Sequence, residues 1–96
     1  MQTAGCGPYV HKGHQTSVRV SFNGAVPSGA AVWIVSDNAM LLLPNGTKSQ
    51  TFAVPIGATS FTTNLTAQLV TAPSTANLTL IDNQGVRRVI STQVIP

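Results

Sequence analysis

Charged side chains are scarce in this 96-residue sequence, in which Asp, Glu, Lys and Arg together make up 7 % of the residues. An average soluble domain has about 25 %. Glu is absent, and Asp37 and Asp82 are the only acidic side chains against five Lys and Arg, giving a formal net charge of +3. Nucleic-acid binding normally needs a clustered basic face. Because these cations are dispersed along the chain, the composition argues against a nucleic-acid partner.

Cysteine and long apolar runs are also scarce. Cys6 is the single cysteine, which excludes an internal disulfide framework, so burial of apolar side chains must hold the fold together. No apolar run approaches the roughly 20 residues of a membrane-spanning helix. No secretory leader is recognisable either. We therefore expect no membrane partner.

Neutral polar residues replace the missing charge, since Ser, Thr, Asn and Gln supply 32 of the 96 residues. Thr and Val suit a pleated surface, and no stretch has a helical period. Short alternating runs are separated by turn residues every 8 to 12 positions or so, which predicts an all-β fold, an antiparallel sandwich of about seven strands. A small barrel is the alternative.

The chain is long enough for one domain. Residues 1–8 contain two Gly and a Pro and are predicted to form an N-terminal arm rather than a regular element. Residues 9–96 are predicted to form the sandwich. Its central stretch, residues 51–65, is expected to be a strand that Pro55 ends, a reversal at Gly57 and a second strand.

Several segments carry a family resemblance. The turn at residues 24–29 precedes the AAVWIVSDN strand and Leu43-Pro44, residues 52–61 read FAVPIGATSF, and Asn77-Leu78-Thr79-Leu80 precedes a last strand that ends at Pro96. From Tyr9 to Pro96 the chain resembles the bacterial immunoglobulin-like repeat domain, which occurs in surface proteins and in bacteriophage virion proteins. The resemblance implies an immunoglobulin-like β-sandwich that serves as a spacer, adhesive or decorating module.

The low charge, the apolar strands and the absent leader lead us to expect a non-enzymatic viral structural protein. It would be a homo-oligomeric decoration or cement protein that docks on a bacteriophage capsid or tail protein within the virion. The alternative is an adhesive or spacer module of the bacterial cell surface, possibly one that binds glycan. No cofactor is expected.

Apolar residues that a solitary sandwich would leave uncovered are the predicted partner interface. Trp33 has two interpretations: it fills the core, as a Trp does in antibody-like domains, or it points outward and anchors an interface. The family resemblance implies a register with Val32 and Ile34 inward and Trp33 and Val35 outward. The same register places Val89 and Ile95 outward on the last strand. The full predicted interface is Met1, Cys6, Tyr9, Trp33, Val35, Met40, Leu41, Leu42, Val89 and Ile95.

Candidate chemical sites are few. Cys6, His11 and His14 form C-x4-H-x2-H, but a structural zinc site needs four ligands and no further Cys or His exists, so a metal would require ligands from other subunits. We predict solvated loop histidines and no metal. Asp37 and Asp82 stand in turn-like contexts, where Asp bonds local backbone, and no Ser or Cys stands in a catalytic frame. We predict no enzyme.

Overall fold

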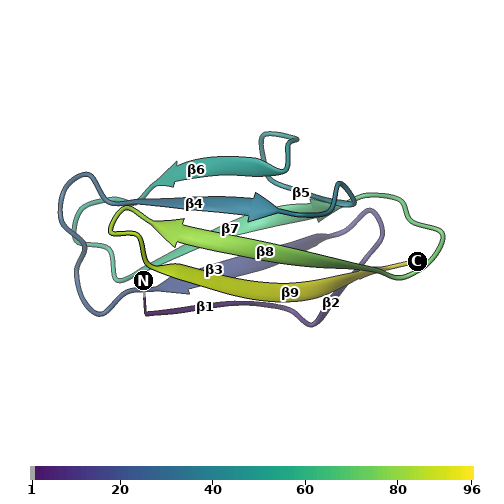
Figure 1. Cartoon of the computed structure of the whole chain (residues 1–96), viewed down its shortest axis with the longest axis horizontal. Coiled ribbons are helices and arrows are strands. Elements are labelled where there is room, and N and C mark those ends of the chain that lie inside the picture. The colour runs from purple at the N-terminus through teal and green to yellow at the C-terminus, as the bar shows by residue number, and fades with distance from the viewer. Residues whose placement is uncertain (1) are drawn as a thin grey trace.

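The computed structural model describes residues 2–96, which form nine β-strands and no α-helix. The strands are β1 (Thr3–Cys6), β2 (Tyr9–His11), β3 (Gln15–Ser21), β4 (Ala31–Ser36), β5 (Leu41–Leu42), β6 (Ser49–Ala53), β7 (Ser60–Ala67), β8 (Ser74–Asp82) and β9 (Arg87–Ile95). One sheet has the order β1-β3-β7-β5, and the other has the order β2-β9-β8-β4-β6 (Figure 1). The all-β prediction is therefore confirmed as a domain of two sheets, one of which curls into a half-barrel.

The strand count and the pairing differ from the prediction in two respects. Nine strands are present in the described residues, rather than about seven, because β1 and the two-residue β5 were not expected. All pairs are antiparallel except β2 and β9, which run parallel with Val10 opposite Val94. A parallel pair cannot be joined by a hairpin, so no local sequence signal indicated it.

Strand β1 corrects the prediction that residues 1–8 lack a regular element. It pairs antiparallel with β3, with Thr3 opposite Ser21 and Cys6 opposite Val18. The chain then leaves this sheet at Gly7-Pro8 and enters the other sheet as β2. Small side chains gave β1 no alternation to read, and its backbone covers the edge of β3, which would otherwise expose unpaired amide groups.

The core lies between the two sheets and follows the predicted alternation. Val18 and Val20 of β3 and Leu65 of β7 face inward from one sheet, and each is 0 % exposed. The other sheet contributes Val32, Ile34, Ala76, Leu78, Leu80 and Val94, all 0 % exposed. Since neighbouring strand residues point to opposite faces, this inward set decides which residues point outward.

The stretch at residues 51–65 takes the predicted form. Strand β6 ends before Pro55, and the Ala58 amide donates to the Pro55 carbonyl (3.1 Å) across a turn in which Gly57 has a φ of +85°. Such a φ favours Gly, which has no Cβ. The Gly57 amide also donates to the Val26 carbonyl (2.9 Å). This reversal carries the chain from the five-stranded sheet to β7 of the four-stranded sheet.

The domain is elongated, with principal extents of 43 × 22 × 19 Å. The two ends of the chain lie toward opposite ends of the long axis (Figure 1). None of the described residues belongs to a helix that could cross a membrane.

Thr92 provides a test of the core. It is 1 % exposed, and its hydroxyl has no hydrogen-bond partner among residues 2–96. A buried hydroxyl without a partner costs about 1 kcal/mol or more, and Val has nearly the same shape. We predict that Thr92→Val raises the free energy of unfolding by about 1 kcal/mol, which raises the melting temperature by roughly 4–8 °C in a domain of this size.

Thr75→Val is the matched control, because Thr75 is exposed on β8 of the same sheet. It should change the free energy of unfolding little. Urea denaturation of both variants checks the prediction. A Thr92→Val variant less stable than the parent would contradict it and would mean that the hydroxyl is hydrogen-bonded.

Candidate docking surface

The outer face of the five-stranded sheet carries an apolar patch. With Val32 and Ile34 inward, alternation along β4 turns Trp33 and Val35 outward, and Trp33 is 45 % exposed. Trp33 pairs with Ile81, and Val35 pairs with Thr79, which in turn pairs with Val89. Val89 is 61 % exposed. We call the set Trp33, Val35, Ile81 and Val89 the Trp33 face.

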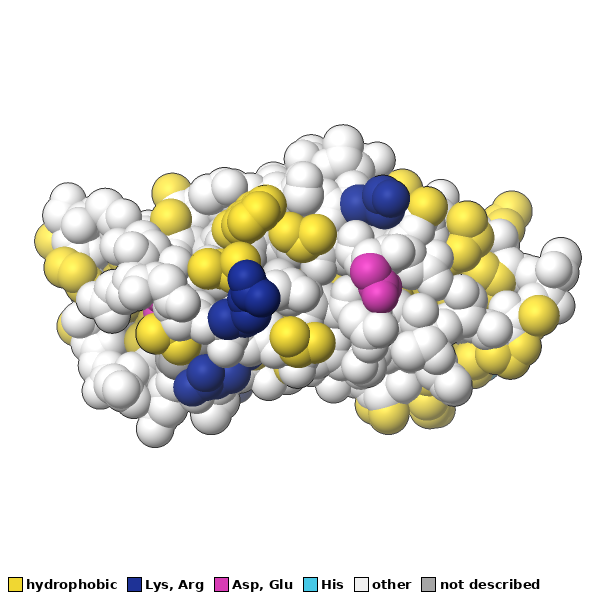
Figure 2. Space-filling model, viewed as in Figure 1, with side chains coloured by type: hydrophobic (Ala, Val, Ile, Leu, Met, Phe, Trp, Pro, Cys, Tyr) yellow, Lys and Arg dark blue, Asp and Glu magenta, His cyan; other side chains and the backbone are white. Residues whose placement is uncertain are grey.

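The cationic side chain of Arg87 borders the Trp33 face. Arg87 pairs with the outward Ile81 at the start of β9 and is exposed, whereas Arg88, also exposed, pairs with the inward Leu80 and so points to the other side of the strand. The Arg88 guanidinium donates to backbone carbonyls, at 3.0 Å to Arg87 and 3.4 Å to Gln2. Figure 2 shows apolar and basic side chains side by side on this face. A partner with an apolar centre and an acidic or carbonyl-rich border fits such a surface.

On β3 and β7 the outer face of the four-stranded sheet is polar by contrast. Ser17 of β3 donates through its hydroxyl to Asn64 Oδ1 of β7 (2.9 Å), and Gln15 Nε2 donates to Thr66 Oγ1 (3.4 Å). Arg19 is exposed next to the Ser17–Asn64 pair, opposite Thr62. Side chains of this kind are well solvated, so the two outer faces differ in chemistry and only the Trp33 face is suited to burial.

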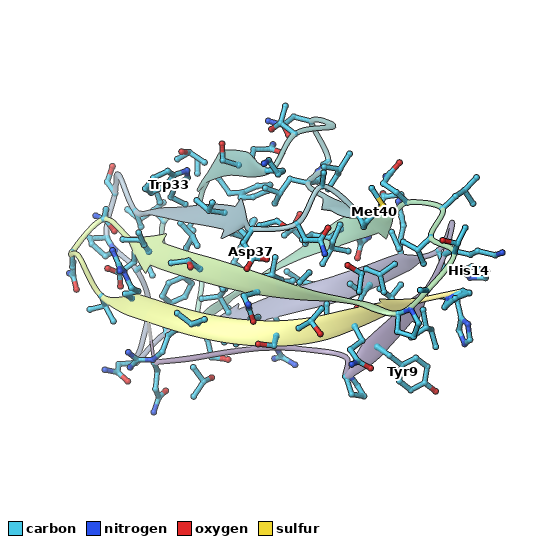
Figure 3. The ribbon with its side chains drawn as sticks, turned by 45° about the vertical axis from the view of Figure 1, so that its right-hand side comes forward. Tyr9, His14, Trp33, Asp37 and Met40 are labelled. Carbon is cyan, nitrogen blue, oxygen red and sulfur yellow. The ribbon has the colours of Figure 1, made fainter. Side chains whose placement is uncertain are left out.

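A hydrogen-bond network ties three strands together beside the Trp33 face. The Asp37 carboxylate, just after β4, accepts from the Asn77 backbone amide (2.8 Å) and from Asn77 Nδ2 (3.0 Å). Asn77 Oδ1 in turn accepts from the Ser91 hydroxyl of β9 (2.6 Å). The bonds from Asn77, with a contribution from Lys48, hold the pKa of Asp37 below its ordinary value of 3.8. Figure 3 labels Asp37 and Trp33 on this part of the molecule.

The lowered pKa of Asp37 makes the stability of the folded protein depend on pH. A carboxyl whose pKa is lowered on folding stabilises the protein above the unfolded-state pKa, and this contribution is lost as the pH falls through the lowered folded value. Asp37→Asn should therefore reduce the free energy of unfolding by roughly 0.5 kcal/mol at pH 7, a modest figure because the site is solvated. Below the folded pKa the two proteins should converge. Denaturation at pH 7 and at acid pH measures this, and an equal difference at both would contradict it.

The predicted interface residues fall into separate groups. Trp33, Val35 and Val89 lie together on one outer face, which resolves the two interpretations of Trp33 in favour of the outward one. Tyr9 is 55 % exposed on β2, at the end of the molecule that also carries His14 (Figure 3). Ile95 is half-buried on β9. Met1 lies outside the described residues.

Leu41 moves from the predicted interface to the core. It is 0 % exposed, whereas Met40 and Leu42 on either side are half-buried. Leu41 pairs with Ala67 of β7 in the short strand β5, which turns its side chain toward the other sheet. Three consecutive Leu residues follow Met40, and such a run does not reveal which member points inward.

Cys6 is half-buried, and its thiol contacts the Ser91 carbonyl oxygen at 3.7 Å. Burial raises the pKa of the Cys6 thiol. A neutral thiol is a poor nucleophile and a poor metal ligand. No group of three or more His, Cys, Asp or Glu side chains that could hold a metal occurs in residues 2–96, so the structure does not bring Cys6, His11 and His14 together as a ligand set.

The two acidic side chains have structural roles. Asp82 Oδ1 accepts from the backbone amides of Gln84 and Val86 (both 2.9 Å) and so fixes the β8–β9 hairpin, as the turn interpretation predicted. Asp37 differs, because it bonds a residue on another strand rather than local backbone. Asp82 also lines a hollow of about 170 Å³ with Phe22 and Val26, below the roughly 300 Å³ of typical small-molecule pockets.

Ile81 was missed by sequence reasoning. It is a central member of the Trp33 face, because it lies opposite both Trp33 and Arg87. Its signal was present, since Leu78 and Leu80 alternate on one side of the strand and Ile81, next to Leu80, must then lie on the other side. Leu69 and Ile56, exposed by 78 % and 73 %, were also missed. Both lie in loops, where no alternation predicts exposure.

No model of a known protein family matches this chain, and no curated protein sequence matches it.

Proposed function

We propose that this chain is a non-enzymatic structural protein that docks on a neighbouring protein through the Trp33 face. The observation that carries the proposal is the contrast between the two outer faces. One presents Trp33 and Val89 to solvent, at 45 % and 61 % exposure, and the other presents only polar side chains on β3 and β7. Trp is enriched at interface hot spots, and removing such a residue typically costs at least about 2 kcal/mol of binding free energy.

An immunoglobulin-like topology is part of the proposal. Its support is the strand order: β1, β3 and β7 are neighbours in one sheet, and β4, β8 and β9 are neighbours in the other. The immunoglobulin fold has strands A, B and E in one sheet and strands C, F and G in the other. With β1 as A, β3 as B, β4 as C, β7 as E, β8 as F and β9 as G, the two arrangements correspond.

The partner that we propose is a bacteriophage capsid or tail protein, so that this chain decorates or cements a virion. The support for this assignment is the resemblance of residues 9–96 to the immunoglobulin-like repeat, the low content of charge and the uncovered apolar face. The mechanism is burial: Trp33 and Val89 leave water on docking, and Arg87 meets an acidic or carbonyl-rich border.

If the Trp33 face is the docking surface, substitution of Trp33 should strongly weaken binding to the partner. Trp33→Ser should weaken binding by about 30-fold or more, which corresponds to 2 kcal/mol. The measurement is cosedimentation of the purified chain with virions or tails that lack it. Val89→Asp should also weaken binding, because it buries a charge at the interface.

Asn64→Asp is the matched control, since it introduces the same charge on an exposed strand position of the opposite face. It should leave cosedimentation nearly unchanged, and circular dichroism should show that all variants fold. Equal binding by Val89→Asp and Asn64→Asp would remove the Trp33 face as the docking surface.

A bacterial cell-surface module is the second candidate function. The observation that favours it is the position of the chain ends toward opposite ends of a 43 Å long domain, which suits domains joined in a row. Tandem copies of this sequence within one gene would support it. Neighbouring genes for capsid and tail proteins would support the virion assignment instead.

A further inference from the structure

Two histidines stand at the ends of one tight turn, at the end of the molecule away from Trp33 (Figure 3). The His14 backbone amide donates to the His11 carbonyl (3.0 Å), and Gly13 has a φ of +75°. A hydrogen bond between the first and fourth residues with a positive φ at the third is the pattern of a type II turn. The turn brings the two imidazoles together, with ring centroids 6.3 Å apart.

The spacing suits a chelate. Zinc binds His nitrogen at about 2.0–2.1 Å in tetrahedral geometry, so two imidazoles on one ion have ring centres roughly 5–6 Å apart. A small rotation of the exposed His14 side chain closes the remaining gap. The Tyr9 ring lies edge-on to His11, with centroids 5.6 Å apart. This contact restricts the His11 ring and lowers the entropy lost on binding.

We propose that His11 and His14 form a two-histidine chelate for a zinc-class divalent ion, and that two copies of this chain share the ion. Zinc prefers four ligands in a closed site. Residues 2–96 contain no group of three or more His, Cys, Asp or Glu around this turn. Two turns related by a two-fold axis supply four imidazoles, and such a closed arrangement is the commonest symmetry of protein oligomers.

The surroundings of the turn suit contact between two copies. Tyr9 and Leu69 are exposed by 55 % and 78 %, and Leu69 lies beside the turn, since a Cβ placed on Gly13 would be 4.0 Å from its Cδ2. Both would lose contact with water in a dimer joined at this end. Lys12 is the charged side chain within the turn. The positive charge of Lys12 repels a metal cation. Lys12 therefore weakens metal binding and supplies no ligand.

The test is a zinc titration of the full chain, produced without a polyhistidine tag. Calorimetry should give one zinc per two chains, and light scattering should show the mass doubling on addition of zinc and returning to its starting value with EDTA. Magnesium, which prefers oxygen ligands, should have no effect. His11→Gln and His14→Gln should each weaken zinc binding at least about tenfold and abolish the dimer.

Lys12→Gln is the matched control, because it changes the same turn without removing an imidazole, and it should bind zinc at least as tightly as the parent. Trp33→Ser should form the zinc dimer normally, which separates this site from the proposed docking function. Zinc binding of equal strength in the parent and in both His variants would overturn the proposal. Binding of one zinc per chain without a change of mass would overturn the proposal that two chains share the ion.

Discussion

The structure depends on a layer of aliphatic side chains between two sheets. The single cysteine leaves no internal disulfide, so this layer must stabilise the fold largely by itself. Val18, Val20 and Leu65 meet Ile34, Leu78 and Leu80, all 0 % exposed. Burying one such side chain fully contributes about 1.5–3 kcal/mol. A register shift of one residue would expose the inward set of a strand and bury its outward set, so the layer also fixes the strand register.

The same constraint produces the Trp33 face. With Val32 and Ile34 in the core, Trp33 and Val35 have no inward alternative, and Ile81 and Val89 are placed outward by their own strands. The core therefore leaves apolar residues in excess on one outer face. On β3 and β7 of the other sheet the outward positions are Gln, Ser, Thr, Asn and Arg. An apolar excess on one face of an otherwise polar domain is explained by function better than by stability.

Sequence reasoning predicted the parts of the fold that alternate. Alternating apolar residues such as Val18 and Val20 of β3 share one face in the structure, because period-two patterns are read directly from the sequence. Strand β1 was not predicted, since its small residues show no such pattern and its pairing with β3 is a tertiary contact. The parallel pairing of β2 with β9 was missed because it is also a tertiary contact.

Some of the candidate site residues were also placed correctly from the sequence, and others were not. The family resemblance placed Val89 outward, but the sequence left Trp33 open between core and interface. Leu41 was assigned to the interface although it is buried, because an unbroken apolar run carries no parity. Cys6, His11 and His14 looked like one ligand set in the sequence. The structure separates them, because Cys6 belongs to β1, where its thiol faces the Ser91 carbonyl, and the two histidines share a turn after β2. Spacing along the chain does not report the turn type that brings two imidazoles within reach.

We propose that a partner protein covers the Trp33 face in the assembled state. Hydroxyl-radical footprinting tests it directly, because oxidation of Trp33 and Val89 reports their access to water in the isolated chain and in the particle. We expect both residues to be oxidised readily in the isolated chain and protected in the particle, with Thr62 and Asn64 on the opposite face reacting alike in both. Equal oxidation of Trp33 in the two states would show that the Trp33 face stays uncovered in the particle.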